Sequence, residues 1–251
     1  MAEDLKEAGG KVRLYVNAPL AAGIAVAPDE GQAHYLMHVM RAKAGDRVTL
    51  FNGRDGEWMA EIAEVSKRAI ALRCLSRIAP QAEVPDLWLA FAPIKKTPSD
   101  YLVQKAAELG VRALLPVFTR RTIVTRINPE RMAANAVEAA QQSGRLSVPR
   151  VAAGVSFERL LADWPKERTL YFCDEGGDAL PLADAATGHV GPAAILTGPE
   201  GGFDPAERAA LRALPFVVPV TLGPRILRAD TAALAALAIW QSVAGDFSQQ
   251  H

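Results

Sequence analysis

The chain has 251 residues, half of them hydrophobic, and its 28 Lys and Arg residues balance its 28 Asp and Glu residues. This length suffices for one large domain or two smaller ones with a real core. The neutral balance argues against a general polyanion binder but leaves room for a local basic face. Because no apolar run could cross a bilayer and the charged start is unlike a signal peptide, we expect a cytoplasmic protein.

The cysteines and histidines do not predict a metal or redox site. Cys74 and Cys173 are far apart and belong to no ligand motif, so we expect two buried thiols in a reducing compartment. His34 and His38 have the four-residue spacing of helical metal ligands, but no third ligand accompanies them. We therefore expect no bound metal.

The first part of the chain, residues 1–76, predicts a small β-barrel that follows a loose tail over residues 1–10. Residues 52–56, Asn-Gly-Arg-Asp-Gly, are a strong hairpin turn signal between two strands. One helix is expected to begin at Asp29, where Gln32 completes a capping box. The expected strands cover residues 12–16, 46–51, 57–65 and 69–75.

Residues 77–85 predict a linker, and residues 86–251 predict an α/β domain. Apolar runs of strand length alternate there with helical segments, which is typical of a mainly parallel sheet covered by helices. Thr97 is the expected N-cap of the first helix, with Pro98 in its first turn. The expected strands cover residues 86–92, 112–118, 168–173, 193–197 and 216–221. The expected helices cover residues 97–109, 128–143, 156–162, a stretch opening at 204, and 231–243.

Two glycine-containing loops follow the last two of these strands. In an open α/β sheet, loops at the carboxyl ends of neighbouring strands form the ligand site. Gly201 and Gly202 allow a ligand to approach the backbone closely, although a tight turn without a ligand would use glycine in the same way. The second loop favours a site, because Arg225 and Arg228 stand three residues apart. We expect the Ile226 and Leu227 side chains between them to be buried.

The two loops, in this order and spacing, resemble the RsmE family of bacterial 16S ribosomal RNA uridine N3-methyltransferases, which belong to the SPOUT class. The motifs are GPEGG at 198–202 and LGPRILRADTA at 222–232. Further matching groups are KAAELGV at 105–111, EAAQQSGR at 138–145, and HYL, VMR and GD between 34 and 46. The resemblance covers nearly the whole chain. Asp230 replaces the family's usual glutamate and keeps its charge, and His38 replaces a usual apolar residue.

The resemblance implies a SPOUT-type α/β methyltransferase domain with a trefoil knot, preceded by a PUA-like β-barrel. S-adenosylmethionine should bind in the knot, and the barrel should bind RNA. The implied partners are 16S rRNA in the small ribosomal subunit and a second copy of the chain, with no membrane or DNA partner. The final helix agrees with a homodimer, because it carries more apolar residues than one face needs.

The implied cofactor pocket draws on both loops and on the end of an earlier strand. Backbone groups at the strand ends would recognise the adenine edge. The expected cofactor-binding residues are Leu196, Thr197, Gly198, Glu200, Gly201, Gly202, Leu222, Gly223, Ile226, Leu227, Thr231 and Phe172.

Methylation of a uridine at N3 needs positioning and the management of one proton. The methyl donor is already activated, whereas uridine N3–H is a weak acid that is mostly protonated at neutral pH. An arginine would stabilise the uracil anion, and Arg145 and Arg228 are our candidates. Glu200 is a candidate proton acceptor, although it could equally hold its own loop or a ligand hydroxyl. Because N3 normally pairs, the target base must be unpaired or flipped out.

Basic residues outside the loops are candidates for RNA contacts. They could bind phosphates, or they could be ordinary solvated charge. The candidates are Arg13, Arg41, Lys43, Arg120, Arg121 and Arg126. Two other functions stay open: an RNA-binding ribosome-assembly module that holds the cofactor without catalysis, and a related SPOUT enzyme with another target.

Overall fold

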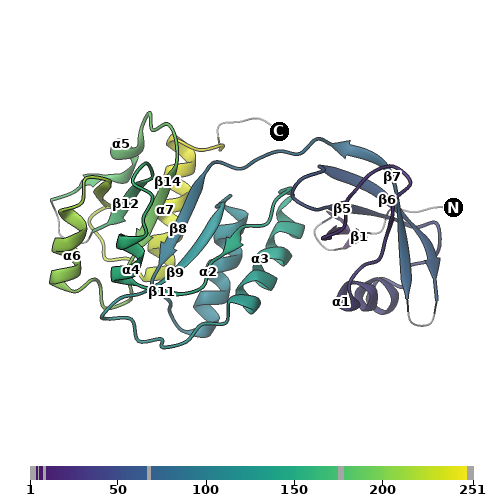
Figure 1. Ribbon diagram of the computed structural model, residues 1–251, viewed down its shortest axis with the longest axis horizontal. Helices are drawn as coiled ribbons and strands as arrows, with labels where there is room; N and C mark the ends of the chain where they lie inside the picture. The colour runs from purple at the N-terminus through teal and green to yellow at the C-terminus, as the bar shows by residue number, and fades with distance from the viewer. Residues whose placement is uncertain (1–3, 5, 8–9, 67–68, 175–177, 248–251) are drawn as a thin grey trace. The chain divides into compact units, whose positions relative to one another are not determined.

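The computed structural model describes residue 4 and residues 6–7, 10–66, 69–174 and 178–247 (Figure 1). The chain divides into two compact units. The first unit comprises Met1–Glu83 together with Ala140–Val148, and the second comprises Val84–Ala139 and Pro149–His251. One stretch from the middle of the chain therefore belongs to the N-terminal unit, a return that the local sequence pattern does not predict.

The first unit is built on a curled five-stranded sheet with the order β3-β5-β6-β7-β4. Its strands are β3 (Arg13–Tyr15), β4 (Ala25–Val26), β5 (Arg47–Phe51), β6 (Glu57–Val65) and β7 (Ile70–Ala79). The strands β3 and β5 are parallel, and the remaining pairs are antiparallel. Register shifts along β6 and β7 bend the sheet around a core that contains Leu14, Leu50 and Leu72.

Two details of this unit bear on the sequence-based expectations. Asp29 and Gln32 exchange both bonds of the predicted capping box at the start of α1 (Glu30–His34), which continues as the π-helical turn η1 (Tyr35–Val39). The loose tail expected over residues 1–10 is wrong in part, because β1 (Lys6–Glu7) pairs with β2 (Gly10–Lys11).

The second unit contains an eight-stranded sheet in which every pair is parallel. Its main strands are β8 (Leu87–Phe91), β9 (Ala113–Phe118), β12 (Thr169–Cys173), β14 (Ala193–Thr197) and β15 (Val217–Thr221). Short strands complete it: β10 (Arg150–Val151), β11 (Val155–Ser156) and β13 (Leu180–Pro181). The order is β10-β9-β8-β14-β12-β15-β13, and β11 also pairs with β9. The predicted parallel α/β fold is confirmed.

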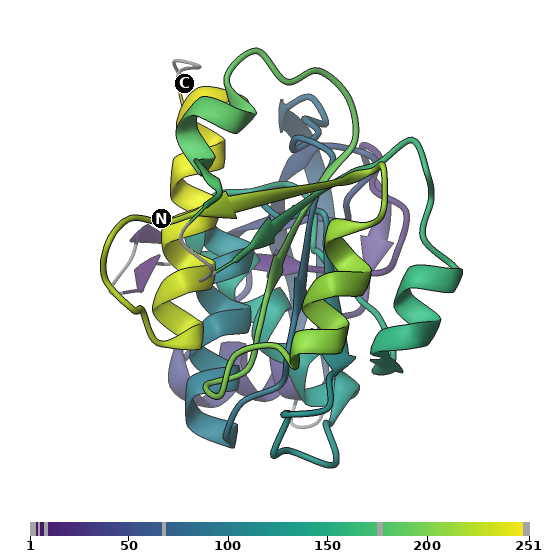
Figure 2. The ribbon, with the colours of Figure 1, turned by 90° about the vertical axis from the view of Figure 1, so that its left-hand side faces the viewer.

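Helices cover both faces of this sheet (Figure 2). One face packs against α4 (Phe157–Ala162) and α6 (Pro205–Arg212), whose apolar residues join a cluster with Phe172 and Leu196. The helix α7 (Ala229–Val243) packs against β14 and against α2 (Lys96–Glu108) and α5 (Leu182–Ala186). The helix α3 (Pro129–Ser143) starts in this unit. Among the described helices, none is long and apolar enough to cross a membrane.

Several helix boundaries differ from the sequence-based prediction. The expected Thr97 N-cap is wrong, because α2 begins at Lys96 and its N-cap is Lys95, which makes no side-chain capping bond. Ser99 donates its hydroxyl to the Ile94 carbonyl instead, at 2.8 Å. The last helix begins at Ala229, two residues before the expected Thr231, and the short α5 was not expected at all.

Candidate functional site

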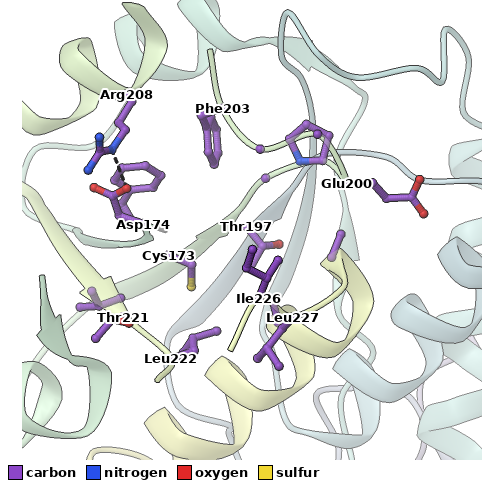
Figure 3. Close-up of a pocket in the computed structure, with 18 of the residues that line it drawn as sticks. Cys173, Asp174, Thr197, Glu200, Phe203, Arg208, Thr221, Leu222, Ile226 and Leu227 are labelled. Carbon is purple, nitrogen blue, oxygen red and sulfur yellow. Dashed lines mark hydrogen bonds and ion pairs between the residues drawn. The ribbon is translucent and has the colours of Figure 1, made fainter. Parts of the chain in front are cut away.

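A cup of about 430 Å³ lies at the carboxyl ends of β12, β14 and β15 (Figure 3). Its walls come from two segments that we call the proline–glycine loop (residues 198–203) and the arginine loop (residues 222–228). The floor includes Phe172, Cys173 and Thr197, the last residues of their strands. The structure therefore brings the two glycine-containing loops together, as the parallel topology predicts.

The proline–glycine loop is held mainly by contacts among its own residues. The Phe203 ring lies against Gly198 so closely that a Cβ atom on this glycine would stand 2.7 Å from the ring. The same ring meets Phe172 edge to face, with centroids 5.0 Å apart. Gly202 has a φ of +67° and donates to the Pro199 carbonyl at 2.9 Å, which closes the turn.

The end of this loop is continuous with a strongly capped helix. Asp204 accepts from Ala206 N–H at 3.0 Å, and Glu207 accepts from Asp204 N–H at 3.1 Å. Glu207 is only 3% exposed and also accepts from Arg120 N–H at 2.9 Å. Arg121 then donates to the Gly201 carbonyl at 3.0 Å. The segment after β9 therefore holds both the loop and the helix start.

A buried carboxylate follows β12 on another wall of the cup. The Asp174 side chain is 2% exposed and lies between the guanidinium groups of Arg208 and Arg212, each with Nε at 2.7 Å. Asp178 accepts two further bonds from Arg212, and these bonds hold the pKa of Asp178 below its usual value. Cys173 precedes this network, and burial raises the pKa of its thiol to about 12.

The arginine loop is far more open. Gly223 adopts a φ of +106°, which favours glycine, and exchanges bonds with the Thr221 hydroxyl at 3.3 and 3.4 Å. Ile226 is 87% exposed, so the expectation that its side chain is buried is wrong for the single chain. Leu227 is half-buried and lines the cup, as does Arg225.

Most of the expected cofactor-binding residues line this one cup. Leu196 does not, because its side chain is fully buried beneath the sheet surface in the α4 and α6 cluster. Thr231 is also absent from the lining and lies in the first turn of α7, with its N–H bonded to Asp230 at 2.8 Å. The lining residues among the candidates are Phe172, Thr197, Gly198, Glu200, Gly201, Gly202, Leu222, Gly223, Ile226 and Leu227.

The three catalytic candidates occupy different places. Glu200 lines the cup, but its side chain is exposed and points away from Thr197 and Cys173 (Figure 3). Arg228 is exposed and is the N-cap residue of α7, just outside the lining. Arg145 belongs to the first unit, where it donates to the Ser147 hydroxyl at 3.1 Å.

Asp174 and Arg208 were missed as lining residues. A signal did exist, because Asp174 directly follows a strand that ends at the ligand edge of the sheet. The pairing with Arg208 joins residues that are 34 positions apart, and a local pattern does not encode it. The described residues contain no group of three His, Cys, Asp or Glu that could hold a metal.

One of the candidate RNA contacts is a largely buried side chain with several hydrogen bonds inside the protein, and the others are exposed. The largely buried side chain is Arg13, whose guanidinium donates to Glu57 and to four backbone carbonyls and which is 13% exposed. An RNA contact of Arg13 stays a prediction. Arg120 and Arg121 are exposed and also bond within their own unit. The remaining candidates, all exposed, are Arg41, Lys43 and Arg126.

Comparison with known proteins finds a matching family model for each part of the chain. Residues 81–241 match the model of an RNA methyltransferase domain, and residues 28–73 match an RNA methyltransferase PUA domain. Ribosomal RNA small subunit methyltransferase E of Rickettsia conorii is 31% identical over 234 residues, which cover 90% of this chain and 93% of the relative.

Solved structures agree with these matches. The crystal structure of ribosomal RNA small subunit methyltransferase E from Neisseria gonorrhoeae bound to S-adenosyl methionine has a TM-score of 0.87 and 30% identity, and covers 94% of this chain and 99% of that chain. A methyltransferase candidate from Legionella pneumophila, solved with bound cofactor SAM, has a TM-score of 0.85 and 28% identity, with the same coverage.

A parallel α/β domain with a cup at its carboxyl edge and a curled PUA-type sheet together define an RNA methyltransferase. More narrowly, the chain belongs to the ribosomal RNA small subunit methyltransferase E family.

Proposed function

We propose that this protein methylates N3 of a uridine in the 16S rRNA of the small ribosomal subunit, with S-adenosylmethionine as the methyl donor. The observation that carries the proposal is the single cup formed by the proline–glycine and arginine loops. Two relatives that cover nearly the whole chain were solved with this cofactor. The family model describes the activity as RNA methylation.

The residues of the cup suit a sulfonium nucleoside. The half-buried Leu222 and Leu227 offer apolar surface, and the open backbone of Gly201 offers N–H and C=O groups to an adenine edge. We assign the lining candidates to the cofactor, and we place Leu196 and Thr231 behind them as supports. When bound, the cofactor supplies a methyl group on an activated sulfonium.

The protein must then stabilise the uracil as its N3 proton leaves. Arg228 stands in the chain between Leu227 and Ala229, which line the cup, and its charge suits the negative O2 and O4 of the deprotonated base. We assign the same role to Arg145. Glu200 is our candidate for the group that accepts the proton, with its exposed carboxylate on the rim.

The remaining assignments concern the assembly. We propose that the first unit binds RNA, with Arg41 and Lys43 among its contacts, and that Arg120, Arg121 and Arg126 add phosphate contacts. We also propose a homodimer, a trefoil knot where the arginine loop follows β15, and action in the cytoplasm, where ribosomal subunits are present. A second copy would cover Ile226.

The test is methyl transfer to small-subunit RNA. Purified protein, labelled S-adenosylmethionine and RNA from cells without the gene should give 3-methyluridine, identified by nucleoside mass spectrometry. A methyl group on another atom or another base would contradict the proposed specificity. Cofactor binding without any transfer would instead support the assembly module.

A further inference from the structure

We propose that Arg13 is a positioning residue that fixes the segment carrying Arg145 onto the first unit. We call residues 140–148 the return segment, since they belong to the N-terminal unit although they follow α3 in sequence. The inference rests on the proposed function, because it takes Arg145 as the group that meets the uracil.

The guanidinium of Arg13 makes five hydrogen bonds, four of them to the return segment. Nη1 donates to two carbonyls and Nη2 to two more, while Nε donates to Glu57 at 2.7 Å. The carbonyls and their distances are Ala140 at 3.1 Å, Gln141 at 2.9 Å, Gly144 at 3.2 Å and Arg145 at 3.1 Å. The planar fork of arginine suits this double pairing, which a lysine could not reproduce.

These carbonyls lie where a helix needs partners. The helix α3 ends at Ser143, so the carbonyls of its last four residues, among them Ala140 and Gln141, have no N–H donor within the helix. A cation at this end also meets the negative pole of the helix dipole. Arg13 therefore acts as a C-terminal cap that comes from a strand about 130 positions earlier in the chain.

Apolar packing fixes the same segment beside these bonds. Phe51, Ala140 and Leu146 form a buried cluster, and Tyr15 packs against it. The Tyr15 N–H donates to Gln141 Oε1 at 3.0 Å, and the Arg13 guanidinium lies 4.8 Å from the Phe51 ring centroid. The return segment is thus docked through side chains and backbone together.

The bond to the Arg145 carbonyl connects this docking to the proposed chemistry. Arg13 touches the backbone of the residue whose side chain we assign to the uracil, and Gly144 beside it adopts a φ of +79°. Loss of the fork would release both carbonyls at this turn. The Arg145 side chain would then lose its fixed base, and catalysis is sensitive to displacements of about 1 Å.

The test is a double-mutant cycle between Arg13→Gln and Arg145→Ala, with Arg77→Gln as the matched control. Arg77 is an exposed arginine of the same sheet, and no hydrogen bond from its side chain to the return segment is described. We expect Arg13→Gln to lower kcat about 10- to 100-fold and to leave the affinity for S-adenosylmethionine within about twofold of wild type. Because both residues act at one point, the double variant should be no slower than Arg145→Ala.

A conservative variant separates positioning from a simple charge effect. Arg13→Lys keeps the charge and the partner Glu57 but loses the fork, so it should be nearly as slow as Arg13→Gln. Full activity in Arg13→Lys would overturn the proposal. Losses that multiply in the double variant, or an effect of Arg77→Gln equal to that of Arg13→Gln, would overturn it as well.

Hydrogen exchange gives a readout that does not depend on activity. In Arg13→Gln the amides of the return segment should exchange faster, while those of β5 and β6 keep their protection. Unchanged exchange in the return segment contradicts the inference even when the protein is active. A wild-type protein that transfers no methyl group contradicts the proposed function instead, and the exchange experiment still tests the docking.

Discussion

The two loops that form the cup differ in how firmly they are held. The proline–glycine loop is held by its own Phe203 ring, by a hydrogen bond from Arg121 and by the helix α6, which begins with a complete capping box. In the arginine loop, the hydrogen bonds described for Gly223 go only to the nearby Thr221 hydroxyl, and Ile226 is 87% exposed. One wall of the site is therefore formed before any ligand arrives.

This difference suggests a division of labour. A fixed wall lowers the cost of binding because its groups are already ordered, whereas an open wall can close on the ligand or on a second subunit. The fixed loop should therefore determine whether the cofactor binds. The open loop should influence transfer more than affinity.

The largest expected effect comes from a side chain placed on the fixed wall. In Gly201→Val, a Cβ atom would stand 3.8 Å from Arg121, an ordinary contact, so the fold should tolerate it. Because residue 201 lines the cup, its new side chain should block the cofactor and weaken binding about 100-fold, or about 2.7 kcal/mol. Titration calorimetry measures this, and wild-type affinity would refute the pocket assignment.

A smaller effect, and one confined to transfer, is expected from Arg228→Ala on the open wall. The variant should lower the single-turnover rate at least about tenfold, because a charge that stabilises the uracil anion is lost. Cofactor affinity should stay within about twofold of wild type. Arg225→Ala is the matched control, since Arg225 lies on the same loop and lines the cup. Equal losses of rate and affinity in Arg228→Ala would remove its assigned role.

The third prediction concerns the packing of the Phe203 ring against Gly198, and it is measured as a change in the free energy of unfolding. Gly198→Ala places a Cβ atom 2.7 Å from the Phe203 ring, so we expect a loss of about 1–3 kcal/mol in the free energy of unfolding. Urea denaturation measures it, with Gly201→Ala as the control that should change little. If Gly198→Ala is as stable as wild type, the ring does not hold the loop. Adding Phe203→Leu to the variant should recover part of the loss.

The smallest effect on function is expected at the floor of the cup. Since burial raises the pKa of Cys173 to about 12, its thiol stays protonated at physiological pH and Cys173→Ala should transfer methyl within about twofold of wild type. A free thiol has a pKa of about 8.5. The stability contributed by the neutral thiol is therefore complete below that pH and falls as the pH rises toward 12. Denaturation of wild type and Cys173→Ala at several pH values between 8 and 10 measures this fall in the free energy of unfolding. The fall should be seen in wild type and should be absent from the variant.

Local signals in the sequence predicted much of this molecule. The capping box at Asp29 depends on residues three apart, and the apolar runs of the parallel strands are continuous, so both are visible in the chain. The ligand site was predicted from two glycine-containing loops that follow neighbouring strands at one edge of the sheet. The N-cap at Thr97 was wrong because the N-cap of α2 is Lys95, two residues earlier, and Lys95 makes no side-chain capping bond.

Long-range pairings could not be predicted in this way. Arg13 was a candidate RNA contact in the sequence, yet it bonds to carbonyls of the return segment that lie 127 to 132 positions away. The Asp174 network joins β12 to α6 across 34 and 38 positions. The exposure of Ile226 was not predicted either, because an apolar residue between two arginines suggests burial, whereas its side chain is 87% exposed.

The most direct test of the central claim is a crystal structure of this protein with S-adenosylmethionine. We predict that the adenosine lies between the Gly201 and Leu222 backbones, above Cys173, with the methyl group facing the mouth of the cup beside Arg228. Electron density for the cofactor anywhere outside the cup would contradict the account.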